Sequence, residues 1–443
     1  MFRKVLLSLI SILTGLFCFS QNHPPRIEEV AAKFYNTYDL YSLPYPTVGI
    51  EKRKTDWKIV TKKYDAGNLA DVDTFLFYDG SRKEYLKLPL AAKTDTAFID
   101  YKNYIDVFSA GNYTLNQYYG YRGWYKDVIA NLDNEKYLSD SALYSLARAY
   151  SAYARSLLTD QTADALTNET FALSLTPNCM SKQQINTYHA AIKKAIDYFE
   201  QLNRKNPAFE TIVGKIGVKY ANEIVIEFHS YLTYAGEYAH SFSLPDNLYP
   251  DSIIEKTKRV LDKCPKDAIL LSFGDNDFYP VLYAQQKLGF RKDVYLINYN
   301  LIGMDRYIFM TSQPQFQSPF IKLSVSPKDY RNHINDYLFI QNNDSTIQFD
   351  DVIDIIKTGK KDENNLLNIP GKKFAVKRNI GQENVSHVYV EMSSSYLLKN
   401  DWILMDILNN LDGRKLVCQG LLYDALSPLN NYLTPIDENL FVF

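Results

Sequence analysis

The 443-residue sequence has few cysteines and, beyond its first 20 residues, no long apolar run. Four cysteines, one of them in that first stretch, are too few for a disulfide-stabilised scaffold. No CxxC or His–Cys pairing suggests zinc, and no P-loop, HExxH, GxSxG or Rossmann glycine fingerprint occurs. These absences argue against the commonest enzyme classes, and they predict free, buried thiols at Cys179, Cys264 and Cys418.

The charge is nearly balanced, which argues against partners that are recognised by bulk charge. The 49 Lys and Arg residues face 51 Asp and Glu residues, for a net charge of −2. Such a chain attracts neither nucleic acid nor an anionic membrane surface. Hydrophobic residues at 46% and charged residues at 23% are typical of folded globular proteins, and the length is enough for two or three domains.

The first 20 residues have the pattern of a secretory signal peptide. Arg3 and Lys4 precede the apolar run VLLSLISILTGLFCF, and Ser20 precedes a polar stretch. We expect cleavage after Ser20 and export of the chain to the periplasm, the cell surface or the medium. No later segment reaches the roughly 20 apolar residues that a membrane span needs, so no span is expected after signal removal.

The next two segments differ in their hydrophobic periodicity. Residues 21–135 contain alternating runs such as WKIVTKKY and DTFLFYDG with a turn signal at Asp79-Gly80, and they predict a small β-rich or mixed N-terminal unit. Residues 136–245 follow a 3.6-residue period and predict helical hairpins similar to tetratricopeptide repeats. A plain helical region is the alternative, because the spacing breaks the repeat period of about 34 residues.

Residues 246–443 predict a doubly wound, mainly parallel α/β domain with an insertion at about 320–395. The apolar strand DAILLSFG, the helix YPVLYAQQKLG and the strand RKDVYLINYNLI follow one another as in a βαβ unit. The insertion mixes the short strands FIKLSV and HVYVEM with polar loops. A helix from Lys399 to Asn410 and a strand from Lys415 to Leu421 repeat the pattern. The predicted fold class is therefore α/β plus α-helical.

The stretch GDND joins the first strand of this domain to its helix. We expect the helix to start near Phe278 with Asp275 or Asp277 as its cap. In open parallel sheets, ligands bind beyond the carboxyl ends of the strands. A purely structural turn that caps the helix and fixes the loop stays open, although a cap explains only one of the two carboxylates. As a ligand site, two carboxylates and an amide favour a hydroxyl-rich ligand such as a sugar, or a hard cation such as Ca²⁺, over a phosphate. The candidate ligand-binding residues on this rim are Gly274, Asp275, Asn276, Asp277, Tyr283, Asn298, Asn300 and Asp305.

The stretch GDNDFYPVLYAQQKLGFRKDVYLINYNLI and the closing segments NDWILMDILNN and NNYLTPIDENLFVF resemble the periplasmic part of a bacterial family of multi-pass membrane proteins. That family is related to transmembrane protein 260 and is described as protein O-mannosyltransferase-like. The resemblance runs from roughly residue 249 to the end. Glycosyl transfer in the family is attributed to acidic residues of its membrane half, so the resemblance implies a relative of an accessory domain and does not by itself carry an enzymatic activity over to this chain. The residues that fit the pattern are Gly274, Asp275, Asn276, Asp277, Pro280, Tyr283, Asp293, Val294 and Asn298.

These patterns together predict an exported, non-catalytic binding or accessory protein of the bacterial cell envelope, linked to glycoprotein or polysaccharide handling. Its expected partner is a glycan or an envelope protein, and no cofactor or metal is assigned. Two alternatives stay open. One is a glycan-acting enzyme that uses Asp275 and Asp277, and the other is a protein–protein scaffold that works through the helical region.

Overall fold

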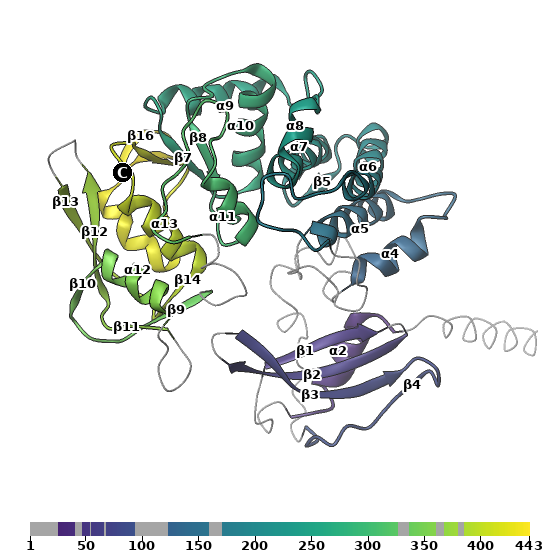
Figure 1. The fold of residues 1–443 in the computed structure, drawn as a ribbon. Helices are drawn as coiled ribbons and strands as arrows, with labels where there is room; N and C mark the ends of the chain where they lie inside the picture. Colours follow the sequence, from purple (N-terminus) through teal and green to yellow (C-terminus); the bar gives the residue numbers. More distant parts are fainter. Residues whose placement is uncertain are drawn as a thin grey trace, which may run out of the picture. The chain divides into compact units, whose positions relative to one another are not determined.

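The chain folds into a mixture of helices and several small sheets, and it divides into two compact units. The first unit holds most residues up to Tyr153, and the second holds most residues from Ala154 on. The predicted signal peptide at 1–20 lies outside the described residues. The structure, a computed structural model, describes residues 25–39, 47–53, 55–65, 68–93, 123–158, 171–326, 336–359, 367–379 and 385–443 (Figure 1).

The N-terminal unit contains a four-stranded sheet in which the strands follow chain order. Its elements are α2 (Ile27–Tyr35), β1 (Thr47–Arg53), β2 (Asp56–Asp65), β3 (Asn68–Asp79) and β4 (Glu84–Tyr85). Trp57, Ile59 and Phe77 are almost fully buried and form one apolar cluster with Val30 and Phe34 of α2. The alternating strands and the turn after Asp79 are therefore present where the sequence predicts them.

The helical pattern that starts at Ser139 is also present. This part of the chain forms two helices, α4 (Trp124–Leu132) and α5 (Asp140–Leu158), and the predicted pattern corresponds to α5. The Ser139 hydroxyl accepts a hydrogen bond from the Ala142 amide at 3.2 Å and caps the start of α5. Leu143, Leu146, Ala147, Tyr150 and Ala154, which the 3.6-residue period places on one face, are all buried in α5.

In the second unit, two long helices pack side by side through an apolar and a polar stripe. Its first elements are α6 (Lys182–Lys205), β5 (Glu210–Thr211), β6 (Gly214–Lys215), α7 (Ile216–Tyr234) and α8 (Gly236–Ser241). A capping box of Ser181 and Gln184 starts α6. Farther along, His189 of α6 lies 2.6 Å from the Glu227 carboxylate of α7, which also accepts from the Tyr231 hydroxyl at 2.8 Å. The Glu227 carboxylate is buried, and its contact with the partly exposed His189 links α6 to α7.

A five-stranded sheet in the order β16-β17-β15-β7-β8 is the centre of the second unit. Strand β7 pairs in parallel with β8 on one side and with β15 on the other, so that Leu271 lies opposite both Ile297 and Cys418. Helix α10 connects β7 to β8, which confirms the predicted βαβ unit. The elements around the sheet are α9 (Asp251–Lys263), β7 (Ile269–Ser272), α10 (Asp275–Leu288), β8 (Tyr295–Asn298), α11 (Asp305–Thr311), β15 (Leu416–Cys418), η4 (Asp424–Tyr432), β16 (Thr434–Asp437) and β17 (Leu440–Val442).

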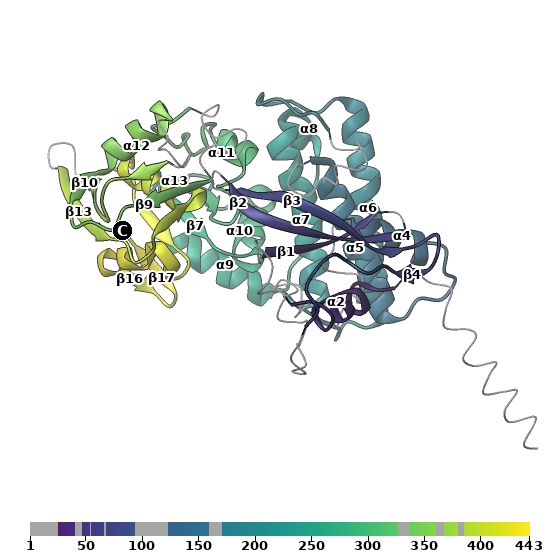
Figure 2. The ribbon, with the colours of Figure 1, turned by 90° about the horizontal axis from the view of Figure 1, so that it is seen from below.

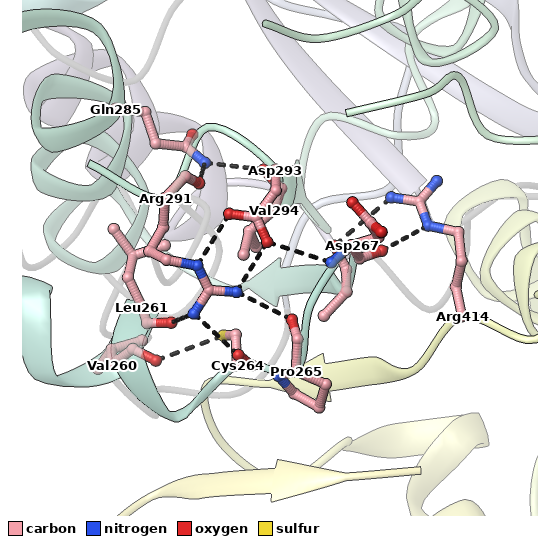
Figure 3. A network of polar contacts seen from close by, with 11 residues as sticks. Val260, Leu261, Cys264, Pro265, Asp267, Gln285, Arg291, Asp293, Val294 and Arg414 are labelled. Carbon is pink, nitrogen blue, oxygen red and sulfur yellow. Dashed lines mark hydrogen bonds and ion pairs between the residues drawn. The ribbon is translucent and has the colours of Figure 1, made fainter. Parts of the chain in front are cut away.

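An arginine network joins the chain segments that enter the parallel strands (Figure 3). The guanidinium of Arg291 donates to Asp293 at 2.8 Å, and this contact holds the pKa of the Asp293 carboxyl at about 2. Asp293 also accepts from the Asp267 amide at 3.2 Å, and the Asp267 carbonyl accepts from Arg414 at 2.7 Å. Asp267, Asp293 and Arg414 precede β7, β8 and β15, so the network ties the starts of all three strands together. The Arg291 guanidinium donates further to the carbonyls of Leu261, Cys264 and Pro265.

The described cysteines are free thiols, as predicted. Cys264 and Cys418 are buried, and Cys179 is partly buried. Burial raises the pKa of the Cys264 and Cys418 thiols to about 12, so both stay protonated at neutral pH.

The region from β9 to α13 adds two three-stranded sheets, β10-β12-β13 and β11-β9-β14. Their apolar residues share one cluster with the central sheet, and Trp402 of α13 is fully buried in it. The predicted strand HVYVEM is present as part of β13. The elements are β9 (Tyr337–Ile340), β10 (Thr346–Gln348), α12 (Phe349–Thr358), β11 (Asn368–Ile369), β12 (Lys373–Asn379), β13 (Val385–Glu391), β14 (Tyr396–Leu398) and α13 (Lys399–Asn409).

The predicted strand FIKLSV at 320–325 is wrong. The segment is not assigned to a strand, although Ile321 and Val325 are buried. The alternation of apolar and polar residues in this segment means only that one side of an extended chain is buried. Alternation does not supply the neighbouring strand that a sheet requires.

Among the described residues, none of the helices combines the length and the apolar character that crossing a lipid bilayer requires.

The arginine network generates a stability prediction. Replacing Arg291 by Met should lower the free energy of unfolding of the second unit by about 2 kcal/mol, because several charged hydrogen bonds are lost. Urea unfolding checks this value. The matched control is Arg204→Met in α6, where the arginine side chain is 74% exposed and pairs with Glu200, so the change should stay within about 0.5 kcal/mol. Equal effects of the two substitutions would contradict the role of Arg291.

Candidate functional site

Helix α10 begins at Asp275, immediately after strand β7 and Gly274. Gly274 is the N-cap in extended backbone, and no side chain caps the helix. The expectation that the helix starts near Phe278 with an aspartate as its cap is therefore wrong. Acidic residues are favoured throughout the first turn of a helix as well as at its cap, so their presence does not fix the starting residue. A start at Phe278 would also have placed Pro280 in the first turn, where proline is common.

Asn276 has a structural role in this first turn. Its side-chain oxygen accepts from the Asn222 amide of α7 at 3.0 Å, and its nitrogen donates to the Val213 carbonyl at 2.8 Å. The Tyr249 hydroxyl donates to Asn222 at 2.8 Å and extends the chain of hydrogen bonds. Asn276 thus fixes the start of α10 against α7 and the β5–β6 turn, and both ends of its amide are used.

The two aspartates of the turn point into different surroundings. Asp277 lines a crevice together with Lys256 of α9, whereas Asp275 is not among the residues that line it. The pKa of the Tyr249 hydroxyl is raised by burial and, to a smaller extent, by the charge of Asp275. Asp275 therefore acts on the buried side of α10 that faces α7. The sequence predicts both carboxylates on one rim, and the structure brings only Asp277 to the crevice.

The crevice consists of two adjoining cavities with volumes of about 220 and 480 Å³. Its walls are α9, the first turn of α10, the residues that follow β15, and the turn between β16 and β17. Strand β16 lies beside α9 (Figure 2). The residues common to both cavities are Lys256, Val260, Asp277 and Gln419. The crevice lies beyond the carboxyl ends of β7 and β15, where parallel sheets usually bind ligands.

Asp277 is a half-buried carboxylate without a partner. Within the described part of the chain, it makes neither a side-chain hydrogen bond nor an ion pair. Burial raises the pKa of the Asp277 carboxyl, and the positive charge of Lys256 partly offsets this effect. Two accepting oxygens with little solvent and no protein donor are therefore available to a ligand.

Gln419 presents a donor to the same space. Its side-chain oxygen accepts from the Ser272 hydroxyl at the end of β7, which fixes the orientation of the amide. In the described residues, the Gln419 side-chain nitrogen has no acceptor. The next residue, Gly420, has a φ of +129°, a conformation that residues with a side chain rarely adopt. The tight turn at Gly420 keeps Gln419 at the crevice.

The charges around the crevice are mixed. The β16–β17 turn contributes Asp437 and Glu438, and α9 contributes Arg259 and Lys256. Arg259 lies 3.7 Å from Asp437, and its side chain is 58% exposed, so this ion pair is weak. Neither sign of charge dominates, so neither a strongly anionic nor a strongly cationic ligand is favoured.

The remaining predicted residues lie away from the crevice. Tyr283 is almost fully buried, and its hydroxyl donates to the Pro245 carbonyl at 3.0 Å. Asp305 pairs with the buried Lys399 at 2.7 Å. These two side chains stabilise helix contacts and have no access to a ligand in the crevice.

Asn298 and Asn300 follow β8 on the same sheet edge, but their amides hold the chain in place. The Asn298 side-chain oxygen accepts a hydrogen bond from the Asn300 backbone N–H at 3.0 Å. Asn300 donates to the Phe273 carbonyl, so the ends of β7 and β8 are tied together. The adjacent rings of Phe273, Tyr299 and Tyr423 pack at 5.6 to 5.7 Å. This half of the rim is filled by its own side chains.

Sequence reasoning missed Lys256, Gln419 and Asp437. Gln419 directly follows an apolar strand, which is the signal that identified GDND, but the predicted strand extended to Leu421 and concealed it. Lys256 and Asp437 look like ordinary surface charges in the sequence, and no local pattern identifies them.

Within the described residues, no group of three or more His, Cys, Asp or Glu side chains is arranged to hold a metal ion. The calcium alternative for the GDND turn therefore gains no support.

The unpaired state of Asp277 predicts how it affects stability. Because the folded-state pKa is raised above 3.8, ionisation of Asp277 disfavours folding, and its contribution to stability falls as the pH rises through the raised pKa. Asp277→Asn should therefore be at least as stable as the parent protein at pH 7 and lose this advantage near pH 4. Urea unfolding at both pH values measures it. A large loss of stability at pH 7 would show that Asp277 is a structural partner.

The comparisons with known proteins identify part of the chain. Neither a curated protein nor a solved structure matches it. Residues 254–434 match the family model of TMEM260-associated domain 2, and this match supports the resemblance to the family related to transmembrane protein 260. The matched range contains most of α9, the parallel strands β7, β8 and β15, and the crevice residues Lys256, Asp277 and Gln419.

Proposed function

We propose that the protein is an exported, non-catalytic accessory protein of the bacterial cell envelope and that its crevice binds a hydroxyl-rich ligand, a glycan. The observation that carries the proposal is the half-buried, unpartnered carboxylate of Asp277 beside the free amide nitrogen of Gln419. Sugar hydroxyls both donate and accept hydrogen bonds, so they fit a site that offers an acceptor and a donor at once.

The shape and charge of the crevice support this ligand class. Val213, Val218 and Pro280 give the smaller cavity an apolar wall, and Asp277 and Lys256 are polar groups at the junction of the two cavities. Sugars present apolar ring faces and polar edges, so a site with one wall of each kind fits them. The mixed charge favours a neutral ligand over a phosphate or a polycation.

The link to the cell envelope rests on the sequence. The first 20 residues have the pattern of a signal peptide, and residues 254–434 match a domain associated with TMEM260. We propose the periplasm or the cell surface as the location, and glycoprotein or polysaccharide handling as the context.

The finer architecture is part of the proposal. The chain runs from β7 to β8 toward one edge of the sheet, and from β15 through η4 to β16 and β17 toward the other edge. Such a change of direction is typical of the switch point of a doubly wound sheet. The crevice lies at this point. The pair α6 and α7 supplies one antiparallel helical hairpin of the tetratricopeptide-like kind.

A glycan-acting enzyme that uses Asp275 and Asp277 together has less support. A glycosidase needs two carboxyl groups that face one bond, about 5 to 9.5 Å apart across the substrate. Asp275 is not among the residues that line the crevice. The scaffold alternative through the helical region has no specific observation in its favour.

A glycan array followed by calorimetric titration tests the proposal. We expect the mature chain to bind oligosaccharides of mannose, glucose or galactose, and Asp277→Ala to lower the affinity at least about tenfold, as expected for losing a hydrogen bond to a charged group. Asp275→Ala is the matched control from the same helix turn and should leave the affinity unchanged. Array binding that both substitutions reduce equally, or no array binding at all, would refute the glycan site.

The same samples distinguish binding from catalysis. Release of reducing ends from the bound oligosaccharide by the parent protein, and its loss in Asp277→Asn, would establish the enzyme alternative. We expect no release by either protein.

A further inference from the structure

A second cavity lies in the same unit and shares no lining residue with the crevice. Its volume is about 270 Å³, and its walls come from α7, α8, α10, β8, α11 and the loop that follows α11. Pockets for drug-sized ligands begin at about 300 Å³, so this cavity is the size of a single ring with a substituent.

Aromatic rings form much of the wall. Phe228, Tyr307 and Phe316 line the cavity. The His229 ring also lines it and packs against Tyr307 with a centroid distance of 5.7 Å and against Phe278 at 5.1 Å. A flat aromatic ligand can pack edge to face on such rings, which an aliphatic ligand cannot do.

His229 stays uncharged in this environment. Burial lowers the pKa of its imidazole to about 4, so at neutral pH it offers one donor and one acceptor nitrogen. In the described part of the chain, the imidazole has no hydrogen bond or ion pair. The same holds for the side-chain amide of Gln286, which lines the cavity from α10.

Other polar groups of the wall are already used. The Gln315 side chain accepts from the Leu296 amide at 2.7 Å and covers the edge of β8, and the Thr233 hydroxyl donates to the His229 carbonyl at 2.8 Å. His240 also lines the cavity and is exposed. A ligand therefore meets the open side chains of His229, His240 and Gln286, and the lining offers no Asp, Glu, Lys or Arg that could compensate a charge of its own.

We propose that this cavity is a binding site for a neutral, ring-sized aromatic molecule that carries an amide or hydroxyl group. The ring packs among Phe228, Tyr307 and Phe316, and the substituent exchanges hydrogen bonds with His229 and Gln286. A charged substituent of the same size is rejected, because it would lose its hydration without gaining a counter-charge. This site does not depend on the glycan proposal, because the two cavities have no residue in common.

Three probes of the same shape test the charge requirement. Benzamide is neutral, benzoate is an anion and benzamidinium is a cation, and calorimetric titration at pH 7 measures the affinity of the full mature chain for each. We expect benzamide to bind in the millimolar range or more tightly, and both ions to bind at least about tenfold more weakly. Equal affinity for all three, or no binding of benzamide, would overturn the proposal.

Two substitutions locate the bound probe. His229→Phe keeps an aromatic ring among Phe278 and Tyr307 and removes the hydrogen bonds, so the protein should stay folded and bind benzamide more weakly. Gln286→Glu places one negative charge in the cavity and should reverse the preference in favour of benzamidinium. The matched control is His387→Phe on the exposed face of β13, which should change nothing. Unchanged benzamide binding in both cavity variants would place the probe elsewhere and contradict the assignment.

Discussion

The parallel pairing of β7 with β8 and β15 is the constraint on which the candidate site depends. Because the three strands run in the same direction, the residues that follow them emerge at one edge, and helix α10 starts there after only Phe273 and Gly274. The arginine network around Arg291 and Arg414 fixes the opposite ends of the same strands. The position of Asp277 is thus set by the sheet. The register of the sheet is set partly by the arginine network at its other end.

Within three residues, the first turn of α10 combines a polar side chain that holds the helix in place with one that is open to a ligand. The Asn276 side-chain amide hydrogen-bonds to Asn222 through its oxygen and to Val213 through its nitrogen. These two bonds fix the rotation of the helix about its axis. That rotation places Asp275 on the side that faces α7 and Asp277 at the crevice. A buried carboxylate without a partner costs folding free energy, and such a cost is common at positions that serve a ligand. The contacts of Asn276 therefore position the half-buried Asp277.

The sequence predicted the elements of this region better than the roles of their side chains. The apolar run before GDND identified β7 and the βαβ unit correctly, because continuous burial leaves a clear local pattern. The directions of Asp275 and Asp277 depend on where the helix begins, because a start at Asp275 places both residues in the first turn, about 200° apart around the helix axis. The partners of Asn276 lie on α7 and the β5–β6 turn, and no local sequence pattern predicts them. Gln419 and Lys256 reach the crevice only through the tertiary fold, so a single sequence could not select them among other polar residues.

The central claim is that the Asp277 carboxylate is half-buried and open to a ligand. A carbon-13 NMR titration of the selectively labelled side-chain carboxyl of Asp277 measures this most directly. The account predicts a titration midpoint above 3.8 and a change of the signal when a bound oligosaccharide occupies the crevice. A midpoint at or below 3.8, with a signal that the oligosaccharide does not alter, would mean that the carboxylate is paired or solvated and would contradict the account.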